Sequence, residues 1–126
     1  MRYKVRPADF RVEEQVRLPP DDRGPFAVYR VRKWGVTTPT VRTRLAARLG
    51  VPQRAVAFPA LKDKVAVAVQ HATVRGGGPR RVTGPGFTAE RVAWLSRPLT
   101  PGDIVANRFA LTLRDMTAAE AAAVSR

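Results

Sequence analysis

The chain has 126 residues, enough for one domain with a core of its own but not for two. Its hydrophobic fraction of 44% supports a folded state, and its formal net charge of +13 implies an anionic partner, because such a charge repels itself until phosphates or anionic lipids neutralise it. The absence of cysteine excludes disulfides and thiolate metal sites. With His71 as the only histidine, a histidine-rich metal site or a Ser-His-Asp triad is hard to build.

RNA is the first partner to expect from this charge, although abundant Arg and Ala with little Lys could also reflect genomic base composition. No apolar run approaches the roughly 18 to 20 residues of a membrane span, and the first residues lack the apolar core of a signal peptide. The sequence therefore predicts a cytoplasmic protein that makes no membrane contact.

Two strands are expected in the first part of the chain. Phe10 and Val12 alternate with charged residues, which predicts a half-buried strand over residues 10–13, and the turn-forming residues 19–25 close it. Residues 26–31 predict a second strand whose alternate residues occupy one buried face and one partly buried face. We expect the two strands to pair antiparallel across the intervening loop.

A helix is predicted over residues 38–50. Thr38 has the character of an N-cap, Pro39 suits the first helical position, and Gly50 stands where a C-terminal cap belongs. Apolar residues recur at helical spacing at Val41, Leu45 and Leu49. The other face carries Arg42, Arg44 and Arg48. This basic stripe, and the flexible basic loop expected over residues 76–81, indicate either solvated surface or contact with an RNA backbone.

The centre of the chain places one carboxylate, Asp63, between Lys62 and Lys64. Short buried strands are expected on either side, over residues 56–58 and 65–69, so that Asp63 would stand on a loop at a strand end. Taken alone, such a Lys-Asp-Lys turn is usually only a solvated tip.

The last part of the chain predicts strands over residues 92–95 and 109–113. Thr117 and Glu120 then form a capping box that starts a helix, which has hardly begun when the sequence stops at Arg126. We therefore expect the chain to be the front part of a longer protein.

Three segments carry a family resemblance together, and they occur in a fixed order. Residues 4–14 read Lys-Val-Arg-Pro-Ala-Asp-Phe-Arg-Val-Glu-Glu, residues 60–64 read Ala-Leu-Lys-Asp-Lys with Ala66 and Gln70 following, and residues 106–109 read Ala-Asn-Arg-Phe. They resemble the Lys-x-x-Pro-Glu-Asp-Phe-x-Val-x-Glu, Gly-Leu-Lys-Asp-Lys/Arg and Gly-Asn-x-Phe motifs of the TruD family of tRNA pseudouridine synthases.

The resemblance implies an α+β fold: half of a pseudouridine-synthase catalytic domain, with a mixed, mainly antiparallel sheet and one or two packed helices. Residues 1–126 would be the N-terminal part of that domain, without its C-terminal part and inserted domain. The implied activity is isomerisation of uridine to pseudouridine in tRNA, at position 13 in the family. The chain alone is expected to be inactive, or active only with a complementing C-terminal segment.

Pseudouridine formation detaches uracil from its ribose, rotates it and reattaches it through carbon, which needs neither a metal nor a redox cofactor. An ionised aspartate can either attack the sugar covalently or stabilise its developing positive charge, and both roles stay open for Asp63. By resemblance, Lys4 would lie near Asp63 and keep it ionised, Phe109 would stack on the base, Asn107 would hydrogen-bond to the nucleotide, and Phe10 would pack against the substrate. Lys62 and Lys64 would point outward to phosphates.

Other interpretations of the same residues remain. Phe10 and Phe109 are in phase with apolar neighbours and suit core packing equally well, and Asn107 could simply shape a turn. The chain could be a non-catalytic basic RNA-binding module that uses the helix arginines and residues 76–81, or a remnant with no role of its own.

Overall fold

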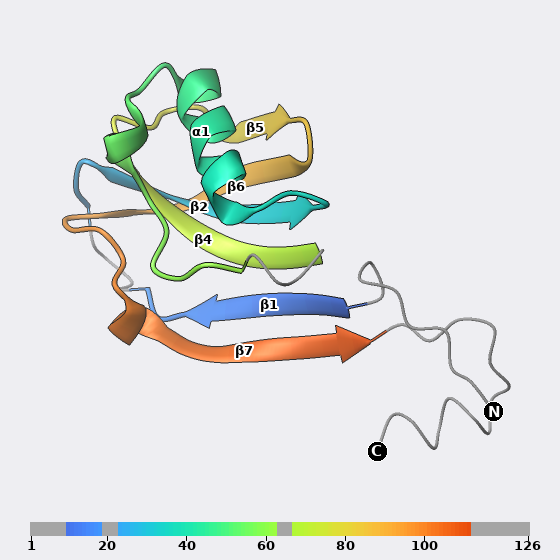
Figure 1. Ribbon diagram of the computed structural model, residues 1–126. Coiled ribbons are helices and arrows are strands. Elements are labelled where there is room, and N and C mark those ends of the chain that lie inside the picture. Colours follow the sequence, from blue (N-terminus) through green and yellow to red (C-terminus); the bar gives the residue numbers. More distant parts are fainter. Residues whose placement is uncertain (1–9, 19–22, 63–66, 112–126) are drawn as a thin grey trace, which may run out of the picture.

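The structure is a computed structural model that describes residues 10–18, 23–62 and 67–111. Within these ranges, seven strands form one mixed sheet and one α-helix packs on a face of that sheet (Figure 1). The elements are β1 (Phe10–Val16), β2 (Phe26–Trp34), α1 (Thr38–Leu49), β3 (Val56–Ala57), β4 (Val67–Arg75), β5 (Arg81–Gly84), β6 (Phe87–Leu95) and β7 (Ile104–Leu111), with short 3₁₀ helices at Gln53–Ala55 and Pro101–Asp103. The expected α+β class with a mixed, mainly antiparallel sheet is confirmed.

β4 is the central strand of the sheet, whose order is β5-β6-β2-β4-β1-β7 with β3 also beside β4. Its residues are buried almost throughout, as in a strand covered on both faces. It pairs antiparallel with β2, from Phe26↔Arg75 to Trp34↔Val67. It pairs parallel with β1, where Arg11 lies opposite Val67.

The expected antiparallel pairing of β1 with β2 is wrong, because β4 lies between them. A strand that is apolar on both faces belongs in the interior of a sheet, with a paired strand along each of its edges. β1 and β2 are the strands that pair with the two edges of β4. β1 instead pairs antiparallel with β7 along its whole length, so that the two strands nearest the ends of the described chain lie side by side (Figure 1).

The main core lies between α1 and the sheet. Val41, Leu45 and Ala46 of the helix are buried against the face of β2 that carries Tyr29 and Val31. The predicted division of β2 into two faces is thus confirmed.

The N-cap of the helix lies one residue earlier than expected. Thr37, not Thr38, is the N-cap, and its hydroxyl accepts a hydrogen bond of 3.3 Å from the backbone N–H of Thr40. Thr38 is instead buried, because its side chain faces the sheet. The expected C-cap is confirmed, since Gly50 has a φ of 70°, a left-handed conformation that favours glycine. Within the described residues, no helix is long and apolar enough to cross a membrane.

The other predicted segments differ mainly in extent. The strand expected over residues 92–95 is the second half of β6, which forms a hairpin with β5. Residues 76–80 connect β4 to this hairpin and are tied to the sheet, because the Tyr29 hydroxyl donates a hydrogen bond of 2.6 Å to the Pro79 carbonyl. Burial raises the pKa of that hydroxyl, so it stays protonated as a donor. The capping box at Thr117 and Glu120 lies outside the described residues.

A second apolar cluster lies on the opposite face of the sheet. Val28, Leu95 and Leu99 are buried there, under the segment that leads from β6 to β7. Asp103 fixes this segment, since its carboxylate accepts two hydrogen bonds from the Arg97 guanidinium, at 2.8 and 2.9 Å, and a third from the backbone N–H of Thr100.

Asp103→Asn is expected to lower the free energy of unfolding by about 1 kcal/mol at pH 7, because the Arg97 side chain is half-exposed and solvent screens the ion pair. The hydrogen bonds from Arg97 and Thr100 hold the pKa of Asp103 well below its usual range. The carboxylate therefore stabilises the fold above the ordinary aspartate pKa of about 4, and this contribution is lost as the pH falls towards the folded-state value. Urea unfolding should show a smaller difference in the free energy of unfolding between the two proteins at pH 2.5 than at pH 7. An equal difference at both pH values would show that the ionised Asp103 carboxylate is not the source of the stabilisation.

Candidate active site

The segment that leads to Asp63 lies where β2 ends and β4 begins, beside the N-terminus of α1. The structure describes this segment as far as Lys62. Asp63, Lys64 and Lys4 lie outside the described residues, as does the side chain of Phe10. The described part of the site consists of the residues that hold Lys62 and of those on neighbouring strands.

Two buried side chains fix the main chain before Asp63. The Thr38 hydroxyl accepts a hydrogen bond of 3.1 Å from the backbone N–H of Lys62 and donates one of 3.2 Å to the Gln70 side-chain oxygen. The Gln70 amide then donates 3.3 Å to the Ala60 carbonyl. Because Gln70 is fully buried in β4, these bonds tie the segment to the central strand of the sheet.

A buried charge cluster fixes the side chain of Lys62. Its Nζ lies 3.3 Å from Oε2 of Glu14, whose side chain is fully buried. The other carboxylate oxygen accepts a hydrogen bond of 3.1 Å from the backbone N–H of His71 and lies 3.4 Å from Nδ1 of that histidine. A buried carboxylate is tolerated only when it is paired and hydrogen-bonded, and Lys62 and His71 meet that need for Glu14.

The expectation that Lys62 points outward to phosphates is therefore wrong. Its side chain is only 10% exposed and its charge is compensated by Glu14. The rule that lysines are usually solvated fails here, because Glu14 would otherwise be a buried carboxylate without a cation. Lys62 thus acts as an anchor for the segment.

A second lysine, Lys33, is completely buried. It is the last core-facing residue of β2, in phase with Tyr29 and Val31. Its Nζ donates a hydrogen bond of 2.9 Å to the Val36 carbonyl. Its position places a cation just before α1, whose Thr38 binds the backbone of Lys62. The alternation along β2 was the signal that could have identified it as an inward-facing lysine.

Asn107 and Phe109 lie on β7, beside the strand that carries Glu14. Asn107 is directly opposite Glu14, and Phe109 is opposite Val12. Directly opposite residues of an antiparallel pair share a sheet face, so both predicted substrate contacts lie on the same face as the carboxylate that anchors Lys62. Phe109 is 73% exposed, so it does not pack in the core, and Asn107 is exposed as well.

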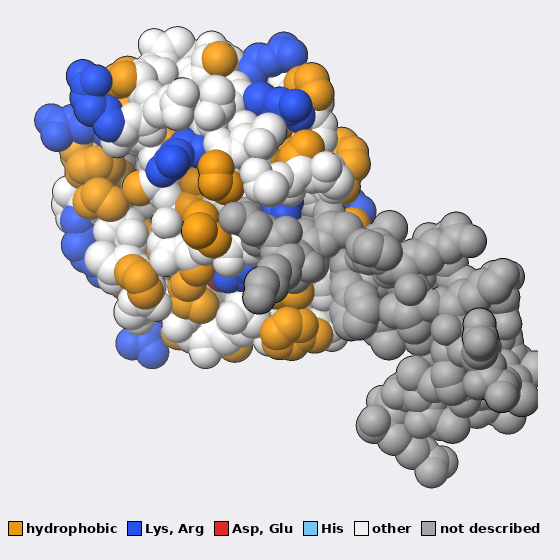
Figure 2. Space-filling view, viewed as in Figure 1, with side chains coloured by type: hydrophobic (Ala, Val, Ile, Leu, Met, Phe, Trp, Pro, Cys, Tyr) orange, Lys and Arg blue, Asp and Glu red, His pale blue; other side chains and the backbone are white. Residues whose placement is uncertain are grey.

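The basic stripe predicted on α1 is only partly free. Arg44 donates a hydrogen bond of 2.6 Å to the Pro85 carbonyl in the β5–β6 turn and so joins the helix to the hairpin. Arg42 and Arg48 are exposed. In the view of Figure 2, basic side chains are scattered over the described surface, with hydrophobic and other side chains between them, and do not form one patch.

The sequence model of the family described as tRNA pseudouridine synthase D (TruD) matches residues 1–126. The chain belongs to the TruD family. Among curated TruD proteins, it is 38% identical over 124 residues to tRNA pseudouridine synthase D of Anaeromyxobacter sp. strain Fw109-5, covering 94% of this chain and 36% of that protein. It is 34% identical over 120 residues to that of Methylococcus capsulatus, covering 91% and 34%.

The TruD fold is also found by structural comparison. The chain matches the crystal structure of a putative tRNA pseudouridine synthase D from Methanosarcina mazei with a TM-score of 0.77 and 19% sequence identity, over 92% of this chain and 28% of that one. The chain thus spans about a third of the length of the curated TruD relatives. The family resemblance of its three motifs is confirmed.

Sequence reasoning missed the contributions of Glu14, Thr38 and His71. Glu14 closes the first TruD-like motif and is in phase with Phe10 and Val12 along β1, so the alternation already placed it on the inward face. Its contact with His71 joins residues 57 positions apart, and no local pattern could have shown it.

Proposed function

We propose that residues 1–126 are the N-terminal part of the catalytic domain of a cytoplasmic tRNA pseudouridine synthase, with Asp63 as its reactive carboxylate. The observation that carries this proposal is the fixing of the chain before Asp63. The backbone of Lys62 is held by Thr38, and its side chain by Glu14. A solvated turn would need neither anchor, whereas a nucleophile must be held in place to within about an ångström.

The reaction breaks the bond between N1 of uracil and C1′ of the ribose. Asp63 either attacks C1′ or stabilises the positive charge that develops on the sugar. The freed uracil rotates, and a bond forms between its C5 and C1′ as any bond between Asp63 and C1′ breaks. The proton lost from C5 is balanced by one taken up at N1. In this proposal Lys4 supplies the cation that keeps the Asp63 carboxylate ionised. No step transfers an electron to or from a cofactor.

The base must leave its stack before it can react, and an exposed aromatic ring suits this task. Phe109 supplies such a ring, because it is 73% exposed. Asn107 lies two residues before Phe109 in β7 and therefore on the same face, where it hydrogen-bonds to the nucleotide. Phe10, at the start of β1, packs against the substrate.

The partner is tRNA, and the reacting nucleotide is uridine 13 by family resemblance. The curated relatives extend well beyond the part that this chain matches. A C-terminal segment would complete the catalytic sheet beside β7, which is an edge strand in this structure. The second candidate function is a non-catalytic RNA-binding module, which the exposed Arg42 and Arg48 favour.

The proposal is tested by incubating the protein with a tRNA transcript that carries tritium at C5 of uridine, since pseudouridine formation releases that label. We expect release when the chain is combined with a segment that corresponds to the rest of a TruD relative, and none from residues 1–126 alone. Binding of the transcript without release in either case would support the RNA-binding module instead.

A further inference from the structure

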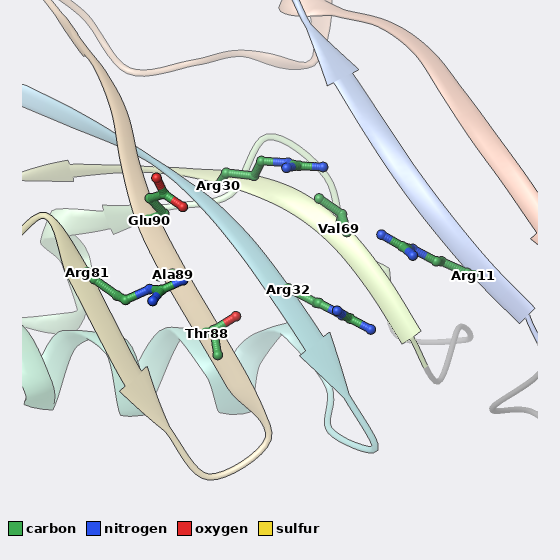
Figure 3. Close-up of a pocket in the computed structure, with 8 residues that line it drawn as sticks. All are labelled: Arg11, Arg30, Arg32, Val69, Arg81, Thr88, Ala89 and Glu90. Carbon is green, nitrogen blue, oxygen red and sulfur yellow. The ribbon is translucent and has the colours of Figure 1, made fainter.

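Four arginines line a hollow on the face of the sheet that points away from α1. They come from three strands: Arg11 of β1, Arg30 and Arg32 of β2, and Arg81 of β5. The hollow has a volume of about 170 Å³. Val69 of β4 also lines it and is almost fully buried. Figure 3 shows the guanidinium groups of Arg11 and Arg30 extending towards Val69 from opposite sides, with Arg32 beside them on β2.

The strand pattern places these side chains together. Arg30 and Arg32 alternate with Val31 and Lys33, which are buried on the face covered by α1, so both arginines project from the other face. Arg32 lies directly opposite Val69, two residues along β4 from the position that faces Arg11. A rigid sheet thus holds the three guanidinium groups around one site.

The positive charge of the hollow is only partly compensated. Arg30 forms an ion pair of 2.7 Å with Glu13, and Glu90 lies opposite Arg30 and Arg81 in the sheet. Among the residues that the structure describes, the side chains of Arg11, Arg32 and Arg81 form no hydrogen bond or ion pair. Like charges on neighbouring strands reduce stability, so a cluster left uncompensated points to an external anion.

We propose that this hollow binds phosphate groups of the RNA backbone. Guanidinium groups bind phosphate oxygens in a bidentate, charge-assisted manner, and several of them on a rigid surface form a phosphate site. The hollow lies on the opposite sheet face from Glu14, Asn107 and Phe109, so it contacts RNA away from the reacting nucleotide. The identity of the anion as RNA rests on the proposed function, whereas the site itself rests on the arginines.

The test compares two double variants that lower the net charge equally. Arg11→Gln with Arg32→Gln removes two guanidinium groups from the hollow, and Arg17→Gln with Arg54→Gln removes two exposed ones that lie outside it. Fluorescence anisotropy with labelled tRNA transcript measures affinity over a range of salt concentrations. We expect the first pair to weaken binding at least about 10-fold and to reduce the salt slope by about two, and the second pair to weaken it less than about 3-fold. Equal effects would overturn the proposal, because binding would then follow net charge alone.

A second measurement needs no variant. The Nε–Hε resonances of the arginines in the unaltered chain are followed by NMR while tRNA transcript or inorganic phosphate is added. Shifts confined to Arg11, Arg30, Arg32 and Arg81 with RNA, at concentrations where phosphate has no effect, are expected. Saturation by inorganic phosphate alone at the same concentration would overturn the assignment to RNA. Neither measurement depends on catalysis. Binding of RNA by the hollow would therefore remain established even if the pseudouridine synthase activity were disproved.

Discussion

Asp63→Asn is expected to abolish pseudouridine formation, by more than about 1000-fold, while tRNA affinity stays within about two-fold. The amide keeps the shape of the carboxylate but can neither attack C1′ nor stabilise a positive sugar. The anchors on Lys62 are independent of the Asp63 side chain, since they involve Glu14 and Thr38. The segment should therefore keep its place in the variant.

This comparison uses the assembly that releases tritium from labelled tRNA, with binding measured in parallel. Asp103→Asn is the matched control, because it makes the same chemical change at the other end of β1, where the Asp103 carbonyl accepts a hydrogen bond from Arg17. The control should retain full activity at temperatures below its unfolding. Activity retained by Asp63→Asn would remove Asp63 from the reaction, and loss of binding would assign it to the scaffold.

Glu14→Ala is expected to lower the free energy of unfolding by about 3 to 5 kcal/mol. The substitution leaves Lys62, only 10% exposed, without its anion and removes the acceptor for the buried backbone N–H of His71. Glu14→Gln retains an acceptor for that N–H but not the charge, so its cost should be smaller, about 1 to 3 kcal/mol. Urea unfolding of the isolated chain measures both.

Glu13 provides a control for this prediction, because it is the neighbouring residue and also forms an ion pair. Its pair with Arg30 is exposed, at 29% and 47% of the two side chains, so Glu13→Ala should cost less than about 1 kcal/mol. Equal losses for Glu13→Ala and Glu14→Ala would show that the buried cluster does not hold the segment. In an active assembly, Glu14→Gln should lower kcat more than it raises KM, because it displaces Asp63 and not the RNA.

Much of the local structure could be predicted from the sequence, because it depends on short-range patterns. Alternation along residues 26–31 predicted the two faces of β2, and the spacing of Val41, Leu45 and Leu49 with Gly50 predicted α1. The pairing of β1 could not be predicted in this way. Its partners, β4 and β7, lie far along the chain, and alternation says which face of a strand is buried but not which strand lies beside it.

The candidate site shows the same limit. Asp63 and Asn107 were predicted from motifs, but the direction of Lys62 was not, because it depends on Glu14, which lies 48 positions earlier. The expected capping role of Thr38 was wrong for a similar reason, since its hydroxyl is used by Gln70 on another element. Lys4 and Asp63 themselves lie outside the described residues, so their proximity stays a prediction.

The neighbouring positions of β1 and β7 constrain the order in which the protein can assemble during synthesis. β2, α1, β4 and the β5–β6 hairpin can combine while the ribosome is still extending the chain, whereas β1 gains its antiparallel partner only after residues 104–111 have emerged. Closing so long a loop is slow. Since Glu14 belongs to β1, the anchor of Lys62 becomes secure, among the described strands, only when this end of the sheet has closed.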